Sequence, residues 1–90
     1  MNKQEHIRRR KSLDEDMKFV EMQLFAYKIA KQKYAELLLK NSKIYNKEFK
    51  EHIDKRISLF THQLEVNKEL IIALEEEYIK SLERGEAIWL

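Results

Sequence analysis

The sequence predicts an all-α protein, an antiparallel hairpin of two long helices that associates into a dimeric coiled-coil or four-helix-bundle assembly. The 90 residues include one glycine and no proline, which argues against folds rich in β-turns. Apolar residues recur in alternating steps of three and four along both halves of the chain. Each half is also apolar on more than one side, so a single partner helix cannot cover it.

Residues 1–11 are predicted to form a basic N-terminal arm of a single domain that spans residues 1–90. The arm ends in four consecutive cations, Arg8, Arg9, Arg10 and Lys11. Ser12 and Glu15 then match a capping box, in which the serine hydroxyl accepts a hydrogen bond from a backbone amide at the helix start. The first helix is therefore expected to span residues 12–40.

A heptad seam, meaning a stripe of residues suited to helix–helix packing, runs along each predicted helix. The seam of the first helix consists of Leu13, Met17, Val20, Leu24, Tyr27, Lys31, Tyr34 and Leu38. The seam of the second helix, predicted over residues 44–84, consists of Ile53, Ile57, Phe60, Leu64, Asn67, Ile71, Leu74 and Tyr78. Lys31 and Asn67 are the polar members, and such residues set register at a cost in stability. Lys31 has the alternative of extending its ammonium group to water.

A short turn is predicted near residues 41–43, because the stretch 40–46 is rich in Asn and Ser and the seam changes phase across it. One continuous helix is the alternative, since four-residue steps through Tyr45 and Phe49 can join the two seams.

The end of the second helix is predicted from Lys80 and Gly85. A cation is favoured in the last turn of a helix, and glycine is favoured at the left-handed position that follows it. Residues 85–90 then form an apolar tail. Its Trp89 is expected to pack back on the bundle, with docking into a partner protein as the alternative.

Apolar residues away from the seams predict a protein interface. The residues expected in it are Phe19, Met22, Phe25, Ile29, Val66, Ile72, Trp89 and Leu90. In the first helix they form a second stripe roughly opposite the seam, and a lone hairpin would leave them in water. A second copy of the chain is expected to cover part of this surface, which makes the protein a homodimer. Covering by the tail within one chain is the alternative.

The charge distribution supports a second functional hypothesis. The net charge is +2, but residues 1–45 carry +5 and residues 46–90 carry −3. The four cations at positions 8–11, with the lysines of the first helix, suit a small nucleic-acid-binding regulator whose affinity falls steeply with salt. No aromatic residue lies among these four cations, so stacking on single-stranded bases is not indicated.

The sequence offers little for catalysis. There is no cysteine, and a single glycine cannot build a phosphate-binding loop. His6, His52 and His62 are expected on solvated faces, because their spacing does not match the Glu-x-x-His pattern of metal-binding bundles. We therefore expect no enzyme activity, cofactor, metal site or small-molecule substrate. The absence of an apolar run of about 20 residues predicts no membrane segment, and a cytoplasmic location is expected.

The expected function is a non-enzymatic protein–protein interaction module, a self-associating hairpin that binds a protein partner through an apolar helix face. The outline resembles small plasmid RNA-binding regulators, phage scaffolding proteins and secreted helical hairpins, although no motif links the chain to any one of them. Its Lys- and Ile-rich composition suits an AT-rich genome such as that of a phage or plasmid. An analogy of fold carries no function by itself.

Overall fold

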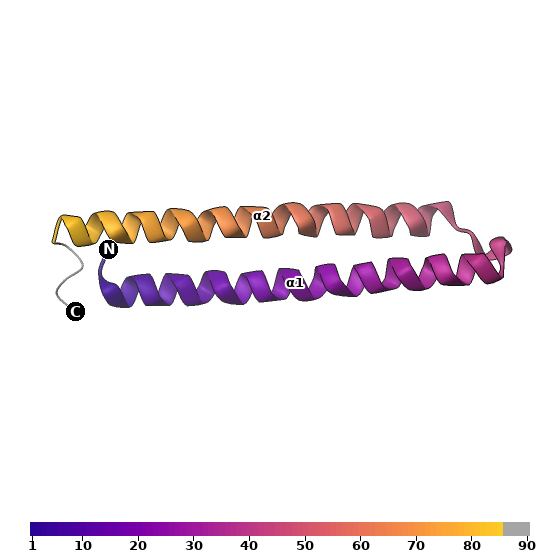
Figure 1. Cartoon of the computed structure of the whole chain (residues 1–90), viewed down its shortest axis with the longest axis horizontal. Coiled ribbons are helices and arrows are strands. Elements are labelled where there is room, and N and C mark those ends of the chain that lie inside the picture. The colour runs from indigo at the N-terminus through magenta and orange to yellow at the C-terminus, as the bar shows by residue number, and fades with distance from the viewer. Residues whose placement is uncertain (86–90) are drawn as a thin grey trace.

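The computed structural model describes residues 1–85 as two long antiparallel helices joined by a short turn (Figure 1). Helix α1 spans Lys3–Lys40, the short 3-10 helix η1 spans Ser42–Ile44, and helix α2 spans Lys47–Glu83. The two long helices lie side by side over their whole length, so the molecule is a rod of 65 × 15 × 15 Å. The all-α hairpin is confirmed, and the alternative of one continuous helix is wrong.

The two seams pack against each other as predicted. The buried apolar side chains are Val20, Leu24, Ile53 and Leu74, and all four belong to the seams. Tyr27 of α1 stacks on Phe60 of α2 at a centroid distance of 5.9 Å. Because each helix buries only this one side, the core is a single layer of side chains along the rod.

Helix α1 begins nine residues earlier than predicted. Asn2 is the N-cap, and its side chain accepts a hydrogen bond from the Glu5 backbone amide at 2.8 Å. The predicted basic arm over residues 1–11 is therefore wrong, because residues 3–11 form about the first two and a half turns of α1. Ser12 lies inside the helix, where its backbone amide already has a partner, so no capping box is needed there.

The turn is longer than the predicted residues 41–43, and α2 begins at Lys47 rather than at residue 44. Asn46 caps α2, since its side chain accepts a hydrogen bond from the Phe49 amide at 3.0 Å. The Tyr34 hydroxyl accepts a hydrogen bond from the Asn46 amide at 2.6 Å, which ties the end of α1 to the start of α2. Tyr34 also packs edge-on against Phe49 at 4.9 Å.

The end of α2 confirms the prediction from Lys80 and Gly85. Lys80 lies in the last turn, and Gly85 has a φ of 77°, in the left-handed region that favours glycine. Its amide donates to the Leu82 carbonyl at 3.0 Å. Residues 86–90 lie outside the described part of the chain, and so do the predictions made for Trp89 and Leu90.

Candidate functional site

A polar cluster closes the open end of the rod, where the N-terminal part of α1 meets the last turns of α2. The His6 ring stacks on Tyr78 at a centroid distance of 4.0 Å, and its Nε2 lies 3.0 Å from Glu75 Oε1. Arg10 Nη1 donates to the same Glu75 oxygen at 2.8 Å, and its Nε donates to Asp14 at 3.1 Å. The prediction of a solvated His6 is wrong, since its side chain is only 15% exposed.

These contacts explain why the basic segment is helical. His6 and Arg10 continue the first seam toward the N-terminus in the same alternation of four and three residues, and Ser81 continues the second. The amino group of Met1 donates to Ser81 Oγ at 3.1 Å. The packing of the two helices therefore extends to the end of the rod with polar instead of apolar partners.

The two ion-pair clusters depress carboxyl pKa values. The pKa of Glu75 lies below its usual value because its carboxylate accepts hydrogen bonds from Arg10 and, to a smaller extent, from His6. The pKa of Asp54 is lowered mainly by the hydrogen bond from Lys31, whose Nζ lies 2.8 Å from Oδ1. Both carboxylates are therefore ionised at neutral pH and hold α2 to α1 electrostatically.

Of the four basic residues predicted to contact nucleic acid, two form ion pairs with carboxylates and two do not. Arg10 is engaged by Glu75 and Asp14, and Arg9 pairs with Glu5 at 2.6 Å. Arg8 and Lys11 are exposed and make no ion pair among the described residues. The four cations therefore do not form one continuous basic surface.

The two polar seam residues differ in their surroundings. Lys31 is mostly exposed at the edge of the seam, as its alternative interpretation expects, but its ammonium group pairs with Asp54 of α2 at 2.8 Å. Asn67 is only 6% exposed, and its Nδ2 has no hydrogen-bond partner in the described part of the chain. A buried amide left unpaired costs about 1–3 kcal/mol.

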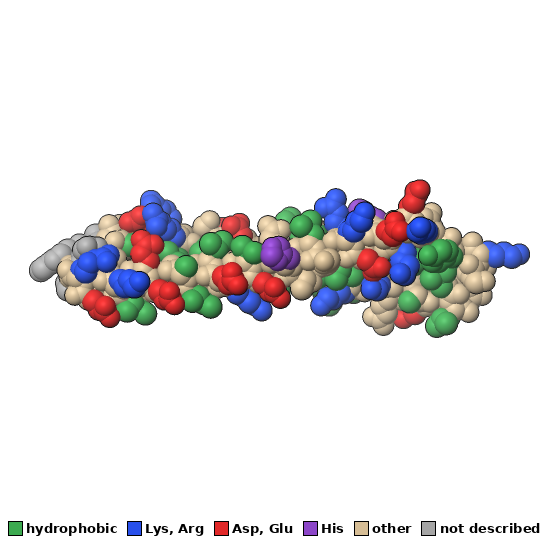
Figure 2. Space-filling view, turned by 90° about the horizontal axis from the view of Figure 1, so that it is seen from above, with side chains coloured by type: hydrophobic (Ala, Val, Ile, Leu, Met, Phe, Trp, Pro, Cys, Tyr) green, Lys and Arg blue, Asp and Glu red, His purple; other side chains and the backbone are tan. Residues whose placement is uncertain are grey.

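The apolar residues predicted for a protein interface lie on the surface. Their exposed fractions are 59% for Phe19, 70% for Met22, 66% for Phe25, 49% for Ile29, 37% for Val66 and 58% for Ile72. The large side chains of α1 alternate with charged residues along the rod, and a view onto the back of α2 shows the same mixture of apolar and charged patches (Figure 2). These six side chains are therefore exposed in the hairpin, as expected. Their burial by a partner protein stays a prediction.

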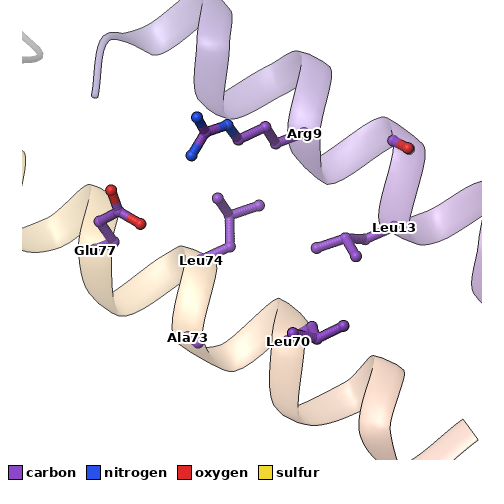
Figure 3. A pocket seen from close by; sticks show the side chains of 7 residues that line it. Arg9, Leu13, Leu70, Ala73, Leu74 and Glu77 are labelled. Atoms are coloured by element: carbon purple, nitrogen blue, oxygen red, sulfur yellow. The ribbon is translucent and has the colours of Figure 1, made fainter. Parts of the chain in front are cut away.

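An apolar groove opens on one side of the rod, between the first turns of α1 and the last turns of α2. Its volume is about 380 Å³, and it is lined by Arg9, Ser12, Leu13, Leu70, Ala73, Leu74 and Glu77. The leucines of the two helices point toward one another along the groove, and Arg9 and Glu77 lie at its outer end (Figure 3). The sequence of either helix alone does not indicate this groove, because its walls come from both helices and meet only in the hairpin.

The described residues bring no catalytic or metal-binding constellation together. No group of three His, Asp or Glu side chains in residues 1–85 is arranged to hold a metal ion. His52 and His62 are exposed, and the ring of His52 lies edge-on to Tyr27 at 6.1 Å. Within the same residues, neither helix has an apolar stretch long enough to cross a lipid bilayer.

Comparison with known proteins adds no further information about the site. The chain matches no protein-family model, no curated protein sequence and no solved structure.

Proposed function

We propose that the protein is a non-enzymatic protein–protein interaction module, a hairpin that self-associates and offers an apolar helix face to a protein partner. The observation that carries this proposal is the exposure of large apolar side chains on the side of α1 that faces away from α2. We name this side, formed by Met22, Phe25 and Ile29, the outer face of α1. All three side chains are about half or more exposed.

The energetics favour a partner for these residues. Fully burying a Met, Phe or Ile side chain stabilises by about 1.5–3 kcal/mol each, so three neighbouring side chains offer a substantial driving force for association. A two-helix hairpin cannot bury them itself, because its helices contact each other only along the seams. Exposed apolar patches rimmed by charge are typical of interaction surfaces.

Light scattering and a hydrophobic dye test the proposal. We expect a mass near twice 11.0 kDa at micromolar concentration, together with dye fluorescence from the outer face of α1 in the dimer. Phe25→Glu should lower that fluorescence several-fold, whereas Lys28→Glu on the same helix should leave it nearly unchanged. A monomer that binds no dye would contradict the proposal, since its apolar side chains would then be satisfied within the chain.

A second candidate is a nucleic-acid-binding regulator. It is favoured by the part of the chain nearest the turn, residues 22–63, which carries nine Lys and Arg against four Asp and Glu. If this surface contacts phosphates, affinity for mixed DNA or RNA should fall steeply with salt, and replacing the exposed Lys28 and Lys33 with Ala should reduce the slope by up to about 2. Absence of binding at low salt would remove this candidate.

A further inference from the structure

The two helices carry a second regular stripe that faces one side of the rod. Along each helix, the residue just before every seam residue lies about 100° from the seam. We name these residues the flanking stripe. In α1 they are Ser12, Asp16, Phe19, Gln23, Ala26, Ala30, Lys33 and Leu37, and in α2 they are His52, Arg56, Leu59, Gln63, Val66, Leu70, Ala73 and Glu77.

The groove shows that both flanking stripes face the same side of the hairpin. Its walls include Ser12 from the stripe of α1 and Leu70 and Ala73 from the stripe of α2, and its floor includes the seam residues Leu13 and Leu74. The two stripes therefore form one continuous surface along the rod, which we name the flanking face.

The opposite side of the rod has a different character. Four of the 16 residues in the flanking stripes are charged, namely Asp16, Lys33, Arg56 and Glu77, whereas eight of the 16 residues just after the seam residues are charged. The residues just after each seam residue supply Asp54 and Glu75, and every ion pair that joins α1 to α2 among the described residues uses one of these two carboxylates. One side of the hairpin is thus closed by ion pairs between the helices, while the flanking face has none among the described residues and half of its 16 residues are apolar.

We infer that the flanking face is the surface on which a second copy of this chain docks, with the turn of each hairpin over the open end of the other. The inference rests on the self-association in the proposed function and specifies its surface and orientation. A four-helix bundle requires each helix to contact two neighbours, and the seam together with the flanking stripe provides two such contact surfaces on every helix. The outer face of α1 then stays available for a different partner.

The size of the face suits a stable dimer. A rod 65 Å long and 15 Å wide offers roughly 1,000 Å² to a second copy, and specific interfaces bury about 800 Å² per partner. Phe19, Leu59, Val66 and Leu70 are the large exposed side chains that would become buried near the middle of this contact.

The charge distribution selects the orientation. Residues 22–63, which form the half of the rod near the turn, have a net charge of +5. Residues 1–21 and 64–85 form the other half and have a net charge of −2. Lys and Arg side chains are correspondingly more frequent toward the turn in Figure 2. Antiparallel docking places opposite charges over each other, whereas parallel docking would place the two +5 halves together.

The middle of the rod supplies a polar contact for the second copy. Gln23 and Gln63 interrupt the flanking stripes near the middle of α1 and α2, and the buried Asn67 lies one helical turn from Gln63. The Asn67 amide has no hydrogen-bond partner in the isolated hairpin. A two-fold axis through the centre of the rod would bring Gln23 and Gln63 of the two copies near one another, and polar residues at such a contact fix register.

Two matched substitutions test the face. Val66→Glu places a carboxylate in the flanking face and should weaken dimerisation at least 100-fold, because both copies would bury an unpaired charge. Ile72→Glu makes a similar change on the other side of α2 and should alter the dimerisation constant less than about threefold. Circular dichroism verifies that both variants stay helical.

A spin label tests the orientation without altering the face. The chain has no cysteine, so Ser42→Cys allows one label per hairpin, in the turn. Antiparallel docking predicts a label separation of about 60 Å, close to the 65 Å length of the rod, whereas parallel docking predicts less than about 25 Å.

The outcomes distinguish this inference from the proposed function. Loss of the dimer in Val66→Glu but not in Ile72→Glu, with the long label distance, supports the docking described. A dimer with the short distance, or one that Ile72→Glu dissociates, overturns this inference but leaves self-association intact. A native chain that stays monomeric overturns both. If Val66→Glu loses its helicity, the label distance alone decides.

Discussion

The single-layer core makes the stability of the hairpin depend on individual seam residues, and Leu24→Ala measures this dependence. Leu24 is 8% exposed and lies near the middle of α1, where the seam is apolar on both helices. Leu39, in the last turn of the same helix, is 90% exposed. Leu39→Ala therefore makes the same chemical change without removing any packing, and it serves as the matched control.

The expected loss for Leu24→Ala is about 2–4 kcal/mol, toward the lower part of the range for buried leucines, because a rod only two helices thick can relax around the cavity. For Leu39→Ala we expect less than about 0.5 kcal/mol, since the side chain is in water in both the folded and unfolded states. A domain of this size has a total stability of roughly 5–13 kcal/mol, so the first change removes a large part of it.

Urea titration followed by far-ultraviolet circular dichroism provides the measurement, with all proteins at one concentration so that dimerisation affects them similarly. With a slope of about 1–2 kcal/mol per molar urea, the midpoint of Leu24→Ala should lie roughly 2 M below that of the native chain. Equal midpoints for the two variants would show that the seam is not the core of the hairpin.

Two further predictions follow from the ends of the helices and the polar cluster. Asn2→Ala should destabilise the protein by about 1 kcal/mol through loss of the N-cap, while Ser12→Ala should be nearly neutral. A lower melting temperature for Ser12→Ala than for Asn2→Ala would instead indicate that the helix begins at Ser12. Glu75→Gln should cost less than about 1 kcal/mol at neutral pH, because Glu75 is partly exposed. Since folding lowers the pKa of Glu75, its contribution is present above the usual value of 4.5 and is lost as the pH falls below it. The stabilities of the native chain and Glu75→Gln should therefore converge toward pH 3, and a constant difference would contradict the assignment.

Much of the fold could be predicted because its determinants are local and periodic. The spacing of Val20 and Leu24 in one helix and Leu74 in the other identified the seam, and the properties of glycine identified the end of α2 at Gly85. The seam position of Lys31 could be predicted, but its pairing with Asp54 could not, because that carboxylate comes close only when the two helices pack.

The start of α1 could not be predicted from apolar spacing, because its packing partners are polar. His6 and Arg10 occupy seam positions, but their value depends on Glu75, which is far away in the sequence and close only after the hairpin forms. The sequence does contain a local signal for this helix start. Asn2 and Glu5 have the same capping-box spacing as Ser12 and Glu15, and the heptad spacing continues without a break from His6 onward.

The sequence predicted the candidate interface as a single set of residues. The three-dimensional arrangement places these residues on different sides of the rod. Phe19 and Val66 lie in the flanking stripes, whereas Phe25 and Ile72 lie outside them. The sequence could not separate these two groups, because the packing of the helices decides which side of α1 and which side of α2 face the same way.

Sedimentation equilibrium of the full chain, from about 1 to 100 µM, measures whether the hairpin self-associates and how many chains the assembly contains. Two-fold docking of one face on itself leaves no free copy of that face, so association must stop at two chains. We expect a reversible monomer–dimer equilibrium that reaches twice 11.0 kDa and does not exceed it. A mass of 11.0 kDa at every concentration, or growth that continues beyond the dimer, would contradict it.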